Sequence, residues 1–238
     1  MRIVITSSPR SGNHWLKCLL SHIYDLEWLR NSEQIGHKPN EVQAWVERGG
    51  FPDNSIYFQH CRYSDRLCDA LEAAPARLAT IIRDPYDVFV SCYYWVQERI
   101  ARGHGRKPHR RDVLAGRPLD DPVVLAYIAE QFGSNISVAS GWLHGGRAVV
   151  VRYEGLHTDP VAELTRATDQ LQPVDRERIE SAIEACRAEN MRQMKRKFSW
   201  QVRAATVGDS RQQLNETVLA VFREHHHDTI RSLGYEVR

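Results

Sequence analysis

The first residues of the chain constrain its fold more than any other segment. Residues 2–6 (RIVIT) form a short β-branched run that is typical of a buried strand, and the turn-forming residues SSPRSG follow directly. Apolar side chains then recur at helical spacing over residues 13–24. A strand that enters a helix through a tight loop is the opening unit of an α/β fold, which favours a parallel sheet.

The same alternation continues along the chain. Further strands are predicted over 55–59, 77–83 and 147–152, and further helices over 64–74, 85–100, 121–143, 159–171, 175–188 and 215–233. The polar stretch 31–54 is expected to be a loop with one short helix, and 102–121 a long exposed loop. The pattern predicts a single α/β domain over residues 1–238, in which helices flank a central parallel sheet on both faces.

Charge and composition exclude several classes of protein. The chain of 238 residues has 32 Lys and Arg against 30 Asp and Glu, a formal charge of +2, so it is not a histone-like or polyanionic protein. No apolar run approaches the ~20 residues that span a bilayer, and the N-terminus lacks a signal-peptide pattern. Its 5 cysteines show no CxxC spacing, so we expect reduced thiols, no zinc site and a cytoplasmic location.

The loop of residues 8–15, SPRSGNHW, is a candidate anion site. Backbone N–H groups of such a loop and the N-terminus of the following helix attract phosphate, Gly12 permits close approach, and Arg10 adds a fork of donors. The Walker pattern G-x-x-x-x-G-K-S/T is absent, so the loop fits phosphate-like groups without ordinary ATP chemistry. The alternative is a tight strand–helix turn with a surface arginine.

Two motifs resemble those of the sulfotransferases. Residues 9–15 are similar to the 5′-phosphosulfate loop of that family, P-K/R-S/T-G-T/N-T/S-W, and only His14 departs from it. The matching residues are Pro9, Arg10, Ser11, Gly12, Asn13 and Trp15. The block from Arg83 to Ser91 resembles the family's 3′-phosphate site, R-D/N-P-x-D-x-x-x-S, in which an arginine at a strand end and a serine on the next helix hold one phosphate.

Weaker matches follow in the same order. Tyr153 begins a segment that resembles the family's YEDL, where the tyrosine approaches adenine. The segment that starts RAATVGD at Arg203 resembles R-K-G-x-x-G-D-W, which implies nucleotide contacts from Arg203, Ala204 and Ala205. Ala205 and Ser210 depart from that pattern. The resemblance covers nearly the whole chain and implies that His14 and Trp15, within the loop, also lie against the donor 3′-phosphoadenosine 5′-phosphosulfate (PAPS).

His60 is the candidate general base. Sulfuryl transfer needs a group that removes the proton of the acceptor hydroxyl, and a cation or donor that stabilises the leaving oxygen. Residues 58–60 (FQH) resemble the family's K-T/S-H, whose histidine removes that proton; Phe58 stands in place of the lysine. Arg10 is then the catalytic cation. His14 and Glu98 are alternative bases.

Other prominent residues have structural explanations. Residues 92–95 (CYYW) are predicted to lie in the core, and the histidines 225–227 to form a surface cluster. Trp15 is expected either to stack on adenine or to pack in the core. The basic residues within 101–118 form either a solvated loop or a lid over the acceptor.

The sequence as a whole therefore predicts a PAPS-dependent sulfotransferase. The acceptor is a hydroxyl of a small molecule, glycan or natural product; no metal, nucleic acid or membrane span is expected, and the oligomeric state is not predicted. Two other functions stay open. A kinase with a phosphate loop is disfavoured by the missing G-K-S/T, and an RNA-binding protein would use the basic segments 99–111 and 192–203.

Overall fold

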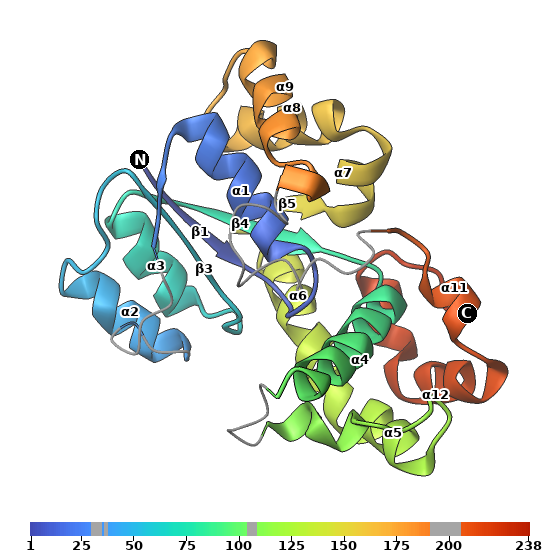
Figure 1. Cartoon of the computed structure of the whole chain (residues 1–238). Coiled ribbons are helices and arrows are strands. Elements are labelled where there is room, and N and C mark those ends of the chain that lie inside the picture. The colour runs from blue at the N-terminus through green and yellow to red at the C-terminus, as the bar shows by residue number, and fades with distance from the viewer. Residues whose placement is uncertain (30–34, 36–37, 104–108, 191–205) are drawn as a thin grey trace. The chain divides into compact units, whose positions relative to one another are not determined.

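Five parallel strands form one sheet in the computed structural model, which describes residues 1–29, 35, 38–103, 109–190 and 206–238 (Figure 1). The described residues make up two compact units. The first contains residues 1–83 and 138–190, and the second contains residues 84–137 and 191–238 except for the undescribed segments. All five strands belong to the first unit.

The strand order is β2-β3-β1-β4-β5, with every neighbouring pair parallel. The strands are β1 (Arg2–Thr6), β2 (Glu27–Trp28), β3 (Ser55–Gln59), β4 (Ala76–Ile82) and β5 (Val149–Arg152). The four predicted strands are confirmed, with small shifts at the ends of β4 and β5. The sequence did not predict β2, because a two-residue strand that begins with an exposed glutamate leaves no periodic pattern.

Helices cover the sheet of the first unit. They are α1 (Asn13–Tyr24), α2 (Pro39–Glu47), α3 (Asp65–Ala73), α6 (Gly133–Gly145), α7 (Tyr153–Thr158), α8 (Pro160–Leu171) and α9 (Arg176–Ala185). The α1 crossover connects β1 to β2 in one direction along the sheet, and the α3 crossover connects β3 to β4 in the other. Because such crossovers are right-handed, α1 and α3 cover opposite faces, as the sequence predicted.

The register of the strands places apolar side chains side by side on one face of the sheet. Val4 lies opposite Tyr57 on β3 and Leu78 on β4, and all three are buried in one cluster with Leu67 and Leu71 of α3. The alternate residues of β1, Ile3 and Ile5, point to the other face and are fully buried there. Both faces of the sheet are therefore apolar and covered, as expected for a parallel sheet.

The second unit is helical in its described part. It contains α4 (Pro85–Ala101), a 3₁₀ turn (Arg110–Leu114), α5 (Pro122–Tyr127), a π-helical turn (Ile128–Phe132), α11 (Ser210–Gln213) and α12 (Glu216–Ser232). The rings of Phe89, Phe132 and Phe222 meet edge to face at 5.5–5.6 Å in its core. Tyr93 belongs to this core and Tyr94 and Trp95 pack against it, which confirms the prediction for residues 92–95.

Three local predictions need correction. The segment 102–121 is not uniformly exposed, because the 3₁₀ turn buries Leu114 completely. The predicted helix 121–143 is interrupted by the π-helical turn. His226 is buried and its Nε2 lies 2.7 Å from the Ile128 carbonyl, so only His225 and His227 are exposed in the predicted surface cluster.

The prediction of five reduced cysteines is wrong. Cys18 on α1 and Cys186, which follows α9, form a disulfide with their Cα atoms 6.0 Å apart. The two residues are 168 positions apart in the chain, so their spacing carries no local signature. Cys61, Cys68 and Cys92 are buried and take no part in this disulfide.

Membrane-spanning helices are lacking in the described ranges: none of the helices there is long and apolar enough to cross a bilayer.

Candidate active site

Most of the predicted site residues follow the carboxyl ends of the strands. The loop of residues 7–12 follows β1, His60 follows β3, Arg83 follows β4 and Tyr153 follows β5. Because the carboxyl ends of parallel strands lie at one edge of a sheet, these four segments meet there, where open α/β sheets bind ligands.

The backbone of the loop has the geometry of an anion site. Arg10 and Gly12 have positive φ angles of 73° and 101°, which turn successive N–H groups toward a common concavity. Gly12 is also the N-cap of the twelve-residue helix α1. The Oγ of Ser11 is buried and has no hydrogen-bond partner within the described part of the chain, as expected of a group that a ligand would satisfy.

The Asn13 side chain makes contacts that stabilise the conformation of this loop. Its side chain contacts Ser7 Oγ, and its Nδ2 donates to the Ser8 carbonyl at 3.4 Å. The Ser8 hydroxyl in turn accepts the backbone N–H of Ala139 at 3.2 Å. Asn13 therefore acts on the loop itself, and a direct contact with the nucleotide stays a prediction.

Tyr153 and Arg83 pack against the loop. A Cβ atom on Gly12 would lie 2.6 Å from the Tyr153 ring, so only glycine permits this approach. The Arg83 guanidinium lies 4.2 Å from the centre of the same ring, and its Nη1 donates to the Arg10 carbonyl at 3.4 Å. The structure thus brings Arg83 and Tyr153, which are far apart in the sequence, to the loop that contains Arg10 and Gly12.

Trp15 packs near the Tyr153 ring and the His157 ring. Its ring centre lies 5.8 Å from that of Tyr153 and 4.8 Å from that of His157. Trp15 is half-buried, unlike a fully enclosed core residue. Its stacking on a nucleobase stays a prediction.

The hydrogen bonds of His60 fix its tautomer. Nδ1 lies 2.9 Å from the Ser7 carbonyl oxygen. A carbonyl oxygen only accepts, so Nδ1 of the neutral ring carries the proton and Nε2 carries the lone pair. The His60 backbone N–H donates to Gln59 Oε1 at 2.8 Å, and Gln59 Nε2 donates to the Tyr57 hydroxyl at 3.0 Å. An oriented ring with an accepting Nε2 is what a general base requires.

Sequence reasoning missed the supporting roles of Ser7 and Gln59. The available signal was a glutamine directly before the histidine, at the end of an otherwise apolar strand. Gln59 is buried, so its amide needs partners and finds them in Tyr57 and the backbone of His60.

His14 lies beside the predicted base. Its ring meets the Phe58 ring edge to face at 4.8 Å, and Phe58 meets His60 at 5.6 Å. Burial lowers the pKa of His14 from 6.5 to about 4, and the nearby Arg10, Lys17 and His60 act in the same direction. His14 is therefore a neutral imidazole at pH 7.

Two acidic residues of the predicted motif from Arg83 to Ser91 make hydrogen bonds within the second unit. Asp84 caps α4 by accepting from the Tyr86 N–H at 2.7 Å, as predicted from the sequence. The Asp87 carboxylate accepts from the backbone N–H groups of Gly208 at 2.7 Å and Ser210 at 2.9 Å. Asp87 thus anchors the turn that closes the predicted C-terminal motif, a role that the sequence did not reveal.

Several predicted residues are not joined to the loop by these contacts. Ser91 lies on α4, in the second unit, and its approach to Arg83 stays a prediction. Arg203, Ala204 and Ala205 lie outside the described residues. Glu98, the alternative base, forms an ion pair with Arg102 at 2.5 Å on the same helix.

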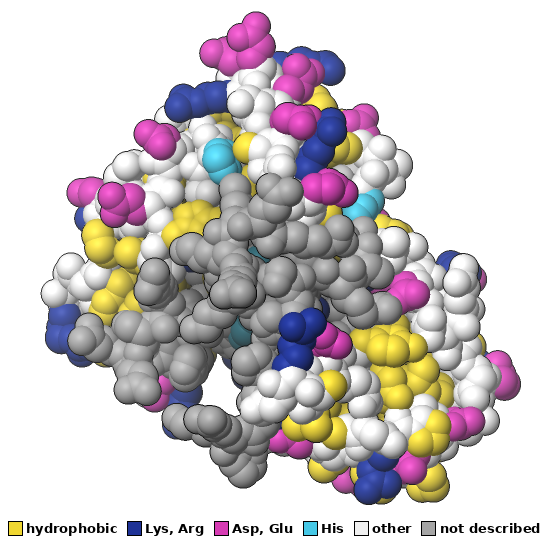
Figure 2. All heavy atoms as spheres, viewed as in Figure 1, with side chains coloured by type: hydrophobic (Ala, Val, Ile, Leu, Met, Phe, Trp, Pro, Cys, Tyr) yellow, Lys and Arg dark blue, Asp and Glu magenta, His cyan; other side chains and the backbone are white. Residues whose placement is uncertain are grey.

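The basic segment 99–111 is less available than its sequence suggests. Arg99 is paired with Asp112, Arg102 with Glu98, and the buried Arg111 hydrogen bonds with Tyr127. Arg110 is exposed, and residues 104–108 and the second basic segment 192–203 lie outside the described residues. Among the described residues, Figure 2 shows acidic and basic side chains interspersed on the visible face.

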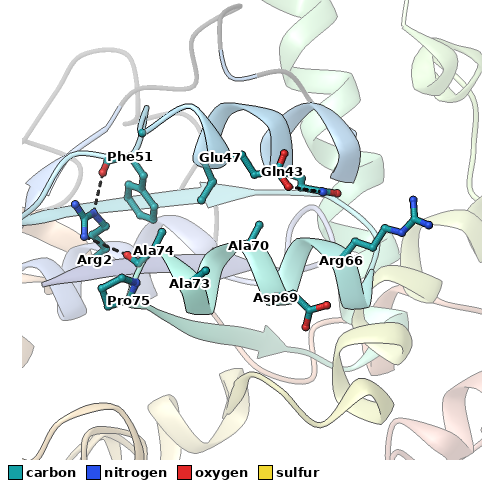
Figure 3. Close-up of a pocket in the computed structure, with 12 residues that line it drawn as sticks. Arg2, Gln43, Glu47, Phe51, Arg66, Asp69, Ala70, Ala73, Ala74 and Pro75 are labelled. Carbon is teal, nitrogen blue, oxygen red and sulfur yellow. Dashed lines mark hydrogen bonds between the residues drawn. The ribbon is translucent and has the colours of Figure 1, made fainter.

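A cavity of about 740 Å³ lies between α2 and α3, away from the loop (Figure 3). Its polar groups are used internally: Arg2 donates to the carbonyls of Phe51 at 2.7 Å and Ala74 at 3.1 Å, and Gln43 donates to Glu47 at 2.7 Å. None of the residues that follow the carboxyl ends of the strands lines it, so this cavity is not the candidate site.

Comparison with known families gives a match that covers almost the whole chain. The family described as "Sulfotransferase domain" matches residues 1–234. A search of curated proteins gave no match.

Solved structures share the fold. A mouse sulfotransferase complexed with PAP (adenosine 3′,5′-bisphosphate) is 18% identical, with a TM-score of 0.69 over 98% of this chain and 88% of that one. Retinol dehydratase in complex with androsterone and PAP is 14% identical, with a TM-score of 0.60 over 100% of this chain and 82% of that one. Its complex with retinol and PAP gives 13% identity and the same TM-score and coverage. These likenesses establish the common α/β fold.

Gly12→Ala should destabilise the protein more than an alanine at another left-handed glycine. Ordinary left-handed strain costs about 1–2 kcal/mol, and the Gly12 variant also has to displace the Tyr153 ring. Gly146→Ala is the matched control, because Gly146 has φ 68° in the same unit and nothing within 4 Å of an added Cβ. Urea denaturation of both variants measures the difference. Equal losses would contradict the packing of the loop against Tyr153.

Proposed function

The chain belongs to the sulfotransferase domain family, and we propose that it transfers a sulfuryl group from PAPS to a hydroxyl group of a small molecule, glycan or natural product. The observation that carries this proposal is the hydrogen bond between His60 Nδ1 and the Ser7 carbonyl, which supports the assignment of His60 as an oriented base beside the candidate anion loop. The PAP bound in the two structural neighbours supports the choice of donor.

The loop is proposed to hold the 5′-phosphosulfate. Its left-handed residues, its buried Ser11 hydroxyl and the N-terminus of α1 suit an anionic group. The residues assigned to the nucleotide are Pro9, Arg10, Ser11, Gly12, Asn13, His14, Trp15, Arg83, Ser91, Tyr153, Arg203, Ala204 and Ala205. Among these, Arg83, Ser91 and Arg203 are assigned to the 3′-phosphate, and Trp15 and Tyr153 to adenine.

In the proposed reaction the acceptor oxygen attacks sulfur in line with the leaving phosphate oxygen. His60 Nε2 takes the proton of the acceptor hydroxyl as the new O–S bond forms. The S–O bond to the phosphate breaks, its electron pair stays on the phosphate, and PAP leaves. Arg10 and the loop N–H groups stabilise the charge that develops on that oxygen. His14, being neutral at pH 7, adds no further positive charge there.

Transfer is proposed to need no metal ion. The transferred group carries one negative charge in the donor, less than a phosphoryl group presents to Mg²⁺-dependent enzymes. The loop also lacks the G-K-S/T residues that position Mg²⁺ in a kinase. We further propose that the two units form one sulfotransferase domain over residues 1–238, and that the protein works in the cytoplasm.

A small-molecule acceptor is the first choice among the three acceptor classes. Retinol and androsterone, the ligands of one structural neighbour, are both small molecules, and this supports a compact organic acceptor here. A radiolabelled-sulfate transfer screen against pooled hydroxyl compounds identifies it.

PAP should bind more tightly than 5′-AMP by about 10–100-fold, because the latter lacks one buried charge-assisted contact. Calorimetry of the wild-type protein measures the ratio. Arg83→Ala should reduce it, whereas Arg77→Ala, which removes an exposed arginine at the other end of the same strand, should not. Equal affinity of the wild type for both nucleotides would contradict the assignment of the 3′-phosphate site.

His60→Ala should lose about 10²–10⁴-fold in turnover, the usual contribution of a general base, and should still bind PAP normally. Turnover of the wild type should fall at acidic pH, because a protonated imidazole accepts no proton, and the residual activity of the variant should lack this acidic limb.

His144→Ala removes an exposed histidine of the same unit and serves as the control. It should leave both turnover and PAP affinity unchanged. If His60→Ala retains near-normal turnover with a confirmed acceptor, the base is His14 or Glu98 instead.

A further inference from the structure

Three metal-ligating side chains gather where α1 meets α9. Cys18 and His22 lie one turn apart on the same face of α1, and Cys186 directly follows α9. One ligand atom from each residue lies within 4.8 Å of those of the other two. Both cysteines are fully buried and His22 is exposed, so the group opens to solvent only at the imidazole.

These atoms form a donor set when the disulfide is reduced. Reduction by a thiol reductant adds two electrons and two protons and converts the Cys18–Cys186 disulfide into two thiols. Two thiolates and one imidazole are ligands that Zn²⁺ prefers. Tetrahedral bonds of about 2.3 Å to sulfur and 2.0 Å to nitrogen place ligand atoms about 3.5–3.8 Å apart. The ligand atoms of this cluster lie within 4.8 Å of one another, close to these separations.

We propose that the reduced protein binds one thiophilic divalent cation, of the Zn²⁺ type, through Cys18 Sγ, Cys186 Sγ and His22. Binding displaces the two thiol protons, and a water molecule completes the tetrahedron on the exposed side. The disulfide and the metal exclude each other, because both use the same two sulfur atoms. In either state the link joins α1 to the end of α9.

This site is independent of the proposed sulfuryl transfer. None of its three ligands belongs to the loop of residues 7–12 or to the residues that follow β3, β4 and β5. The cation therefore has a structural effect on the packing of α1 against α9, helices that are in direct contact. The proposal that the reaction itself uses no metal is unaffected.

Titration with Co²⁺, a spectroscopic substitute for Zn²⁺, tests the site. The full chain is reduced with a phosphine, freed of reductant and metal under argon, and titrated while its absorption spectrum is recorded. We expect one equivalent of Co²⁺ to give a thiolate-to-cobalt band in the near ultraviolet, and Zn²⁺ to abolish it. The oxidised protein should give no such band.

Variants identify the ligands. His22→Gln changes an exposed residue and so preserves the fold. It should weaken Co²⁺ binding at least ~10-fold, since loss of even an outer-shell partner costs ~10–100-fold. His144→Ala, another exposed histidine, should bind as the wild type does. Cys18→Ser and Cys186→Ser should each weaken the thiolate band.

Two results would overturn the proposal. One is a reduced wild-type protein without a cobalt–thiolate band. The other is a band that neither His22→Gln nor the two serine variants change, because Cys61, Cys68 or Cys92 would then supply the thiolate. Both readouts are independent of sulfotransferase activity.

Discussion

The peptide groups of Ser7 hold the candidate anion loop and the proposed base in one arrangement. The Ser7 N–H donates to the Gln59 carbonyl at 3.4 Å, and the Ser7 carbonyl accepts from His60 Nδ1 at 2.9 Å. Ser7, which directly follows β1, thus extends the pairing of β1 with β3. It also orients the His60 ring, which follows β3. Because a carbonyl cannot donate, the same contact sets the tautomer, and in the proposed reaction Nε2 accepts the proton of the acceptor hydroxyl.

The parallel sheet makes this local contact part of a larger site. Each of its four longer strands ends at the same edge, and each is followed by a residue or loop of the candidate site. Arg83 crosses from the end of β4 to the Arg10 carbonyl and the Tyr153 ring, and Gly12 admits that ring because it has no side chain. The proposed binding of an anion and the proposed orientation of a base therefore depend on one sheet edge.

Local patterns in the sequence predicted the parts that local chemistry determines. The buried strand at residues 2–6, the Asp84 cap and the positions of His60 and Arg83 at strand ends were all visible there. The anchoring of Gly208 and Ser210 by Asp87, and the disulfide between Cys18 and Cys186, join residues more than 100 positions apart. No spacing rule connects such residues, because only tertiary packing within each unit brings them together.

The tautomer of His60 tests the central claim most directly. Two-dimensional ¹H–¹⁵N NMR of the ¹⁵N-labelled protein at neutral pH, with His60→Ala to assign the signals, reports which ring nitrogen is protonated. The hydrogen bond to the Ser7 carbonyl predicts a neutral ring with its proton on Nδ1 and a bare Nε2. A proton on Nε2 with a bare Nδ1, or a doubly protonated ring at that pH, would contradict the account, because neither form accepts a proton at Nε2.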